Sequence, residues 1–336
     1  MKNLFYKILI IFILLAVNSY SASNKTNSTT SKSNYISPEE KKREELKKNL
    51  KFWEDTLKYG TITQKITVVN YIKAHNVKEA ENLIVKYYDG EKNFKVRKSM
   101  IEALISFSNH SAVTYVSEMF KKKNKSKDMK KFLMQAVSEL KYKKAYKDIL
   151  NFLDDENLRI RMQAIRTIGE LGVTEVIPTF ITNYKTEKNE RIKTEYILAL
   201  ARLKSPKAES ILLSVFTNAD EPELNRSYAA TGLGYIQTKK ALDTLLRFLP
   251  KEKAAIRHRI AAALGYYNEP EVITTLIDLL KDDDKGVRYY AIKSLEKLKA
   301  QKAIDALKYK KDYDPEFKIR IEAREALKNI TGKTNW

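Results

Sequence analysis

The chain has 336 residues, 43% of them hydrophobic, so it is long enough to bury a sizeable core. Its 9 Gly and 7 Pro are few beside the many Lys, Glu, Leu and Ile residues. This composition favours helices and excludes most all-β folds, because those folds need turn residues at short intervals. Cys is absent, which excludes a disulfide framework, and the formal net charge is +21.

The first 23 residues have the order of a secretory signal peptide. Lys7 precedes ten uninterrupted apolar residues, 8–17, and small residues follow at Ser21 and Ser23. We expect cleavage near Ser21 to Ser23 and a mature chain in the periplasm or cell envelope of a bacterium. An uncleaved membrane anchor is the alternative. Export argues against nucleic acid as the partner, although the charge alone favours it.

A polar segment separates this leader from the first expected helix. Residues 24–36 consist largely of Ser, Thr, Asn and Lys, and we expect a disordered linker there. Ser37 is a good N-cap, Pro38 suits the first helical position, and Glu40 is placed to complete a capping box. The sequence therefore predicts a first helix over about 38–58 and an ordered domain over 37–333.

One basic residue recurs at the start of each amphipathic helix. The stretch "VRYYAIKSLEKL", 287–298, nearly repeats as "IRMQAIRTIGEL", 160–171, and as "IRIEAREALKNI", 319–330. Aligning the basic residue gives nine positions that lie 31 to 33 residues apart. We call them the basic column: Lys65, Arg97, Lys130, Arg161, Lys193, Arg226, Arg257, Arg288 and Arg320. A nearly constant interval of this kind is typical of a repeat protein.

Apolar residues keep the same register. The residue seven positions after each member of the basic column is aliphatic, and the residue before that one is small in eight of the nine repeats. A second amphipathic segment follows, as in 239–249, 269–280 and 301–310. Because a single helix pair cannot bury its own apolar face, the pairs must stack. We therefore predict an all-α fold, a right-handed α-solenoid of about nine stacked helix pairs.

These units resemble the HEAT-like repeats of the phycobilisome-lyase type, which carry a pattern like D-x5-R-x2-A-x2-A-L. The best single match is "DDDKGVRYYAIKSLEKLKAQKAIDALK", 282–308. The resemblance covers roughly 37–333 and is clearest from Asp154 onward. It implies a HEAT-like superhelix, and it identifies an architecture far better than a function.

An acid stands six residues before the basic column in six of the nine repeats. An acid in the turn and a base at the helix start can cap free amides and pair across the stack. The resemblance implies the same structural role for these two positions. The predicted structural ladder contains Asp155, Arg161, Asp220, Arg226, Asp282, Arg288, Asp314 and Arg320. A stripe that binds a partner is the alternative interpretation.

The sequence offers few residues for catalysis or metal binding. Its three histidines, His75, His110 and His258, lie in separate repeats and share no ligand spacing. The acidic turn 282–286 lacks the alternating oxygen ligands and the distal Glu of a calcium loop. We therefore predict no enzyme activity, no cofactor and no metal. A lyase-type enzyme, which the resembled family includes, is the weaker alternative.

Positive charge gathers in the N-terminal half. Residues 24–150 carry 28 basic and 15 acidic side chains, a net charge of +13, whereas 151–336 carry 33 and 27, a net charge of +6. The densest part contains Lys121, Lys122, Lys123, Lys125, Lys127, Lys130 and Lys131. Such a segment could dock on an anionic polymer or membrane surface. A solvated turn that keeps the protein soluble is the alternative.

A second candidate surface lies two and nine residues after the basic column. Seven residues make nearly two helical turns, so both positions should lie on similar sides of adjacent helices. The predicted Tyr/Arg strip contains Arg202, Tyr228, Tyr235, Arg259, Tyr266, Tyr290 and Lys297. Tyr and Arg are frequent interface anchors. Packing of these tyrosines between helices is the alternative.

The sequence as a whole predicts a non-catalytic, exported scaffold. A stack of small units offers a long surface whose residues can vary without loss of the core. We expect it to bind a protein or peptide partner in the cell envelope on its inner helical face. The alternative function is binding of an anionic envelope polymer or lipid headgroup through the basic N-terminal half.

Overall fold

The computed structural model describes residues 38–107, 111–121, 125–334 and 336. The chain divides into two units, residues 1–52 and 53–336. Helix α2 (Pro38–Tyr59) crosses this division and matches the first helix that the sequence predicts. The predicted signal peptide, linker and Ser37 lie outside the described residues and stay predictions. None of the described helices has the length and apolar character needed to cross a membrane.

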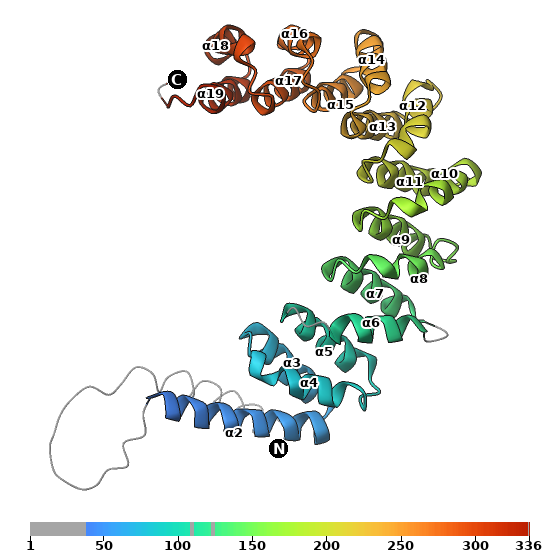
Figure 1. Cartoon of the computed structure of the whole chain (residues 1–336), viewed down its shortest axis with the longest axis vertical. Helices are drawn as coiled ribbons and strands as arrows, with labels where there is room; N and C mark the ends of the chain where they lie inside the picture. Colours follow the sequence, from blue (N-terminus) through green and yellow to red (C-terminus); the bar gives the residue numbers. More distant parts are fainter. Residues whose placement is uncertain (1–37, 108–110, 122–124, 335) are drawn as a thin grey trace, which may run out of the picture. The chain divides into compact units, whose positions relative to one another are not determined.

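Within residues 53–336 the helices alternate between two rows along the chain (Figure 1). The first row consists of α3 (Ile62–Ala74), α5 (Phe94–Ser106), α7 (Lys127–Glu139), α9 (Leu158–Glu170), α11 (Glu190–Arg202), α13 (Glu223–Ile236), α15 (Ala254–Leu264), α17 (Lys285–Lys297) and α19 (Phe317–Thr331). The second row consists of α4 (Glu81–Tyr88), α6 (Ser111–Lys121), α8 (Tyr146–Leu150), α10 (Ile177–Thr186), α12 (Glu209–Thr217), α14 (Lys239–Phe248), α16 (Pro270–Leu279) and α18 (Ile304–Tyr313).

Short 3₁₀ helices adjoin six of the second-row helices. They are η1 (Lys78–Ala80), η2 (Lys143–Ala145), η3 (Thr174–Val176), η4 (Pro206–Ala208), η5 (Leu249–Lys251) and η6 (Gln301–Ala303). Each first-row helix packs against the next first-row helix, from α3 and α5 through α17 and α19. The described residues contain no strand. The predicted all-α solenoid is therefore confirmed.

The basic column marks the helix starts of the first row. Every one of its nine residues is the fourth residue of a first-row helix. Polar residues at the N-cap position fix several of these starts: the side chains of Asn93, Ser126 and Asn157 accept hydrogen bonds from the first turn. Thr61 forms a full capping box with Gln64 at the start of α3. The repeat interval is therefore set by local signals that recur along the chain.

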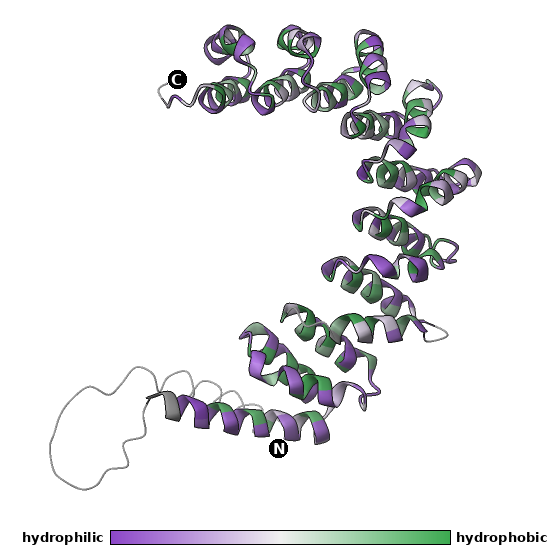
Figure 2. Cartoon of the chain, viewed as in Figure 1, coloured by the Kyte–Doolittle hydropathy of each residue, from purple (hydrophilic) through white to green (hydrophobic). Residues whose placement is uncertain are grey.

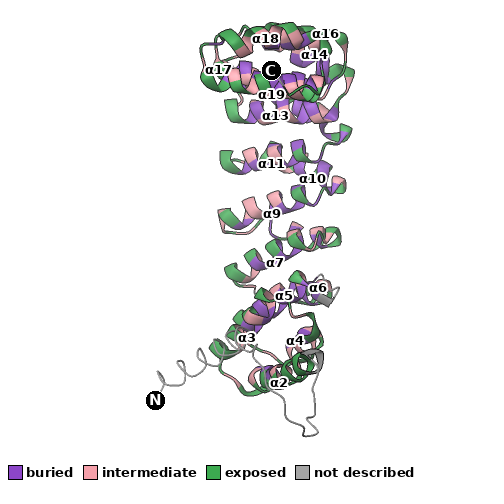
Figure 3. Cartoon of the chain, turned by 90° about the vertical axis from the view of Figure 1, so that its left-hand side faces the viewer, coloured by how far each residue is buried: buried purple, intermediate pink, exposed green. Residues whose placement is uncertain are grey.

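The aliphatic column fills the space between repeats. All nine of its side chains are 0% exposed: Ile72, Leu104, Val137, Ile168, Leu200, Leu233, Leu264, Leu295 and Leu327. In Figure 2 the helices of both rows carry hydrophobic and hydrophilic stretches, as amphipathic helices do. Figure 3 shows buried residues along α7, α9 and α11, with exposed residues at one end of each helix. The core therefore runs continuously from repeat to repeat.

Small residues let the first-row helices approach closely. A Cβ added at Gly234 on α13 would lie 2.7 Å from both Cα and Cβ of Ala263 on α15. At Gly232 a Cβ would lie 2.8 Å from the Cβ of Ala201 on α11. These separations are too short for real contacts, so the two glycines allow α13 to pack between α11 and α15.

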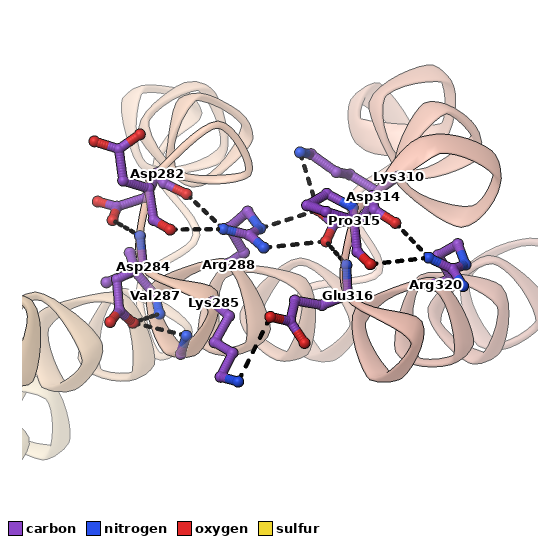
Figure 4. A network of polar contacts seen from close by, with 12 residues as sticks. Asp282, Asp284, Lys285, Val287, Arg288, Lys310, Asp314, Pro315, Glu316 and Arg320 are labelled. Carbon is purple, nitrogen blue, oxygen red and sulfur yellow. Dashed lines mark hydrogen bonds and ion pairs between the residues drawn. The ribbon is translucent and has the colours of Figure 1, made fainter.

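Arg288 joins two consecutive turns of the stack (Figure 4). Its Nη1 donates to the main-chain carbonyl oxygens of Asp282 and Asp283 at 2.9 and 3.0 Å. Its Nε and Nη2 donate to the carboxylate of Asp314 in the next turn at 2.9 and 3.1 Å. The Arg288 and Asp314 side chains are 7% and 0% exposed, respectively. This geometry makes a two-pronged charge pair that is shielded from water.

Asp314 has two further donors. Lys310 Nζ lies 3.1 Å from its carboxylate, and the main-chain amide of Glu316 donates to it at 3.1 Å. Burial by itself raises the pKa of Asp314, but the hydrogen bonds from Arg288, Glu316 and Lys310 outweigh burial and lower that pKa. Asp314 is therefore ionised at neutral pH, and its carboxylate organises the start of α19.

The same contact recurs between other repeats. Arg257 binds the Asp282 carboxylate through Nε and Nη2 at 2.8 and 2.7 Å, and its Nη1 donates to the Glu252 carbonyl oxygen at 2.9 Å. Related ion pairs join Lys65 to Glu91, Lys130 to Asp155 and Arg226 to Glu252. Arg161 and Arg320 donate to the main-chain oxygens of Asp155 and Asp314. In each ion pair the base binds the acid of the following turn and not the acid before its own helix.

Asp220 differs from the predicted ladder. It is exposed, and Lys193, whose position in the column would pair with it, instead pairs with Glu190 at 3.5 Å. The neighbouring Glu221 takes the turn contacts: it accepts from the Tyr184 hydroxyl at 2.5 Å and from Asn225 at 3.2 Å. The ammonium group of Lys193 also lies over the Tyr184 ring. A tyrosine that reaches the turn therefore replaces the ion pair between α11 and α13.

Candidate functional site

Three first-row helices bring five of the seven residues of the predicted Tyr/Arg strip together. Tyr235 comes from α13, Arg259 and Tyr266 from α15 and the turn after it, and Tyr290 and Lys297 from α17. They line one groove together with other side chains of the same three helices. The full lining, which we call the tyrosine groove, is Thr231, Tyr235, Arg259, Ala262, Ala263, Tyr266, Tyr290, Lys293, Ser294 and Lys297.

The tyrosine rings pack edge to face, with lysines over them. The ring centroids of Tyr235 and Tyr266 lie 4.8 Å apart, and the ring planes meet at 84°. Lys297 Nζ lies 2.9 Å from the Tyr266 ring centroid, and Lys204 Nζ lies 4.7 Å from that of Tyr235. The groove therefore has a preformed aromatic floor with positive charge at its edge.

The electrostatics of the groove reflect this crowding of cations. Burial and the nearby Lys204 ammonium lower the pKa of Lys297. Burial, together with the Tyr235 hydroxyl, raises the pKa of Tyr266 to about 12. Tyr266 is therefore a neutral hydroxyl over the physiological range and can donate or accept a hydrogen bond. An anion bound near Lys297 would favour the charged ammonium.

Arg259 lies at the boundary between the tyrosine groove and a second hollow. We call the second one the His258 hollow, lined by Glu223, Leu224, Ser227, Ala255, His258, Arg259 and Tyr290. Arg259 is half-buried, and its guanidinium makes no hydrogen bond or ion pair with any described residue. A half-buried guanidinium carries five donors, so this one has free capacity for an acceptor on a ligand.

His258 is held by the start of the next first-row helix. Its Nε2 lies 2.6 Å from Oδ1 of Asp284, the N-cap residue of α17. The same oxygen accepts from the amides of Gly286 and Val287. The hydrogen bond from His258, together with those two amides, outweighs burial and lowers the pKa of Asp284. This contact fixes the wall of the His258 hollow against α17.

Two residues of the predicted strip lie outside the groove. Arg202 is the last residue of α11, and its Nη1 lies 3.7 Å from Glu170 of α9, so its charge is directed toward the preceding repeat. Tyr228 lines neither hollow. The sequence interpretation in turn missed Lys204, which lies in the turn after α11 and has a left-handed φ of 51°. The signal in the sequence that could have pointed to Lys204 is its position in the repeat, eleven residues after Lys193 of the basic column.

The basic segment of the N-terminal half is only partly described. Lys122 and Lys123 lie outside the described residues. Lys121, Lys127 and Lys131 are exposed, whereas Lys130 is engaged with Asp155 in the ladder. Lys125 is half-buried and has a contact of its own. The segment therefore combines solvated lysines with one that holds two repeats together, and its predicted role in binding anions stays a prediction.

The described residues contain no group of three His, Asp or Glu side chains close enough to hold a metal ion. His75 stacks on Tyr71 with ring centroids 4.1 Å apart. His110 lies outside the described residues.

Known proteins similar to this chain include enzymes. Deoxyhypusine hydroxylase of Candida albicans (strain SC5314) is 22% identical over 232 residues, an alignment covering 59% of this chain and 72% of the hydroxylase. The structure of human deoxyhypusine hydroxylase in complex with glycerol is 18% identical, covers 78% of this chain and 99% of its own, and has a TM-score of 0.34. The CpcE–CpcF complex of phycocyanin lyase from Nostoc sp. PCC7120 is 18% identical, covers 63% of this chain and 86% of its own, and has a TM-score of 0.44.

The similarity to a hydroxylase corrects one prediction. The sequence interpretation predicted no enzyme activity because it found few catalytic residue types, but a relative that is itself an enzyme contradicts that prediction. The family model for HEAT repeats matches residues 122–201, 146–225 and 249–328, which together make up more than half of the sequence. These segments include α15 and α17, two of the three helices of the tyrosine groove, and six residues of the basic column: Lys130, Arg161, Lys193, Arg257, Arg288 and Arg320. The chain belongs to the family of HEAT-repeat proteins.

Proposed function

We propose that this HEAT-repeat chain is a scaffold that binds a polypeptide partner along its first-row helices, with the tyrosine groove as the anchoring site. One observation carries the proposal: Tyr235 and Tyr266, from adjacent repeats, form a preformed ring pair at 4.8 Å, and they share the groove with Arg259, whose guanidinium has no partner among the described residues. Interfaces concentrate their binding energy in Tyr and Arg residues that are already ordered before the partner arrives.

The position of the groove in the repeat supports this function. Its tyrosines, Arg259 and Lys297 lie outside the aliphatic column and are not fully buried, so they can be changed with little effect on the core. Ala262 and Ala263 keep the space above α15 open between the tyrosines of α13 and α17. An extended segment that crosses several repeats could contact equivalent positions on consecutive helices.

The first experiment places a benzophenone-bearing amino acid at Tyr266 in the full chain. The same probe at Tyr309, which is 60% exposed on the second-row helix α18, is the matched control. We expect a discrete polypeptide adduct from the groove position and not from the control. Equal labelling from the two positions, or none from either, would remove the groove as the binding site.

A pair of double variants gives the energetic test. Tyr235→Ala with Tyr266→Ala should weaken binding of the crosslinked partner by about 2 kcal/mol or more, as loss of interface anchors does. Tyr309→Ala with Tyr313→Ala removes another tyrosine pair, with ring centroids 5.1 Å apart on α18, and should leave binding unchanged. Loss of folded structure in the first variant alone would show that its rings stabilise the stack.

A further inference from the structure

Resting on the proposed function, we infer that the tyrosine groove takes an acidic polypeptide segment, with a carboxylate seated between Arg259 and Lys297. The inference concerns the chemical class of the ligand, and it depends on which charges in the groove lack partners. Charge complementarity at such a site selects its ligand more strongly than contact area does.

Arg259 stands apart from the other arginines of the stack. The other buried and half-buried arginines of the described chain each hold a partner within the protein. These are Arg97 with the Tyr88 ring, Arg161 with the Asp155 carbonyl, Arg166 with Glu195, Arg226 with Glu252, Arg257 with Asp282, Arg288 with Asp314, and Arg320 with the Asp314 carbonyl. Arg259 has no such partner among the described residues, although it lies in the same row of helices.

The lysines near Arg259 leave a surplus of positive charge. Lys293 is neutralised by Glu296 at 2.5 Å and by Glu322 at 3.6 Å. Lys297 and Lys204, in contrast, have ring contacts but no carboxylate partner among the described residues. The lining of the tyrosine groove includes no Asp or Glu. Arg259 and Lys297 therefore both line the tyrosine groove as cations that have no ion-pair partner among the described residues.

The shape of the lining favours a carboxylate carried by a peptide. A guanidinium donates two parallel hydrogen bonds to a carboxylate, and the Tyr290 side chain borders both hollows beside it. On the other side of Arg259, Leu224 is 50% exposed and Ala255 adds apolar surface. Glu223 also lines that hollow and would repel a second acid there. A segment with an acid at Arg259 and an apolar side chain on Leu224 fits both hollows.

The test begins with selection of random twelve-residue peptides displayed on phage against the full wild-type chain. Binders that also bind the Arg259→Gln variant are removed by counter-selection. We expect the survivors to be enriched in Asp or Glu at a fixed spacing from an apolar or aromatic residue. Survivors without acids would overturn the inference and leave the proposed function standing. Absence of any enriched peptide would overturn both.

Binding constants for one enriched peptide then separate specific recognition from general attraction to a basic protein. Arg259→Gln and Lys297→Gln should each lower its affinity roughly tenfold or more, as loss of a charge-assisted hydrogen bond does. Arg247→Gln removes the same charge from exposed Arg247 on α14 and is the matched control, expected within about twofold of wild type. The three variants should unfold at the same temperature as wild type.

Three results would refute the assignment. Equal losses in Arg259→Gln and Arg247→Gln would mean that binding reflects net charge alone. Equal affinity for the peptide and for its Glu→Gln counterpart would mean that no carboxylate is recognised. The third result concerns displacement of the bound peptide by a twelve-nucleotide thymidine strand. If the strand displaces it at concentrations where added acidic peptide does not, and only when Arg259 is present, the groove would be assigned to another polyanion.

Discussion

Replacing Arg288 with Met tests whether the ladder holds the C-terminal repeats together. Arg288→Met keeps the aliphatic stem and removes the guanidinium, so Asp314 loses both charge-assisted hydrogen bonds from α17. The main-chain oxygens of Asp282 and Asp283 lose their donor at the same time. The change therefore cuts the link between two consecutive turns without removing any residue of the aliphatic column.

The expected cost follows from the burial of the pair. Breaking a buried ion pair by removing one partner costs about 3–5 kcal/mol, because the other charge stays buried and unpaired. Asp314 is 0% exposed, but Lys310 and the Glu316 amide remain beside it. We therefore expect a loss at the lower end, about 3 kcal/mol in the free energy of unfolding. The partner pair Arg257–Asp282 is 24% and 10% exposed, and Arg257→Met should cost less, about 1–2 kcal/mol.

Urea unfolding measures these differences, and hydrogen exchange locates them. Because α19 contacts α17 and α18 within the described stack, Arg288→Met should raise exchange in α19 before it does so in α13. Arg259→Met is the matched control: it removes a guanidinium with no described partner and should shift stability by less than about 0.5 kcal/mol. A loss in Arg288→Met no greater than in Arg259→Met would refute the structural reading of the ladder.

Three further changes test local features. Gly234→Ala should destabilise the chain by about 1–3 kcal/mol, because the new Cβ would lie 2.7 Å from Ala263. Gly90→Ala is the control in thermal unfolding and should not destabilise the chain, because a Cβ there would have no atom within 4 Å. Lys141→Gly should stabilise the chain by up to about 1 kcal/mol in urea unfolding, because Lys141 has a φ of 50°, which glycine adopts without strain. The free energy of unfolding should fall as the pH drops below about 4, the ordinary range of the Asp pKa. The pKa of Asp314 is lowered in the folded chain, so the unfolded chain binds the proton first. A flatter dependence of stability on pH in Arg288→Met would be the sign of this linkage.

The sequence predicts the helices of the stack well because their signals are local. Each member of the basic column marks the fourth residue of a first-row helix, and each aliphatic residue seven positions later is fully buried. N-caps such as Asn93 and Ser126 act within one turn of their own residue. Periodicity and caps do not depend on how distant repeats pack, so both can be read before the fold is known.

The partners of the polar side chains could not be predicted in the same way. Glu252 pairs with Arg226, as a ladder acid does. The sequence pattern does not include it, because it stands five residues before Arg257 and the pattern places the acid six residues before the base. At the edge of the tyrosine groove, Tyr235 packs with Lys204, which lies in the turn of the preceding repeat, and this neighbourhood arises only after the helices stack. The repeat register separates Arg257, in the basic column, from Arg259 two residues later. That Arg257 pairs with Asp282 while Arg259 has no partner among the described residues is seen only in the folded chain.

The ladder also bears on how such a chain can grow. Consider a tandem copy of the block from Lys285 to Glu316, inserted directly after Glu316. The copied arginine would stand six and five residues after the original Asp314 and Pro315, as Arg320 does now when it donates to both carbonyl oxygens. Inside the copy, the arginine would meet its own acid at the spacing of Arg288 and Asp314. Duplication of a whole block therefore creates a junction whose contacts already exist elsewhere in the protein, and the number of repeats can change without new pairing chemistry.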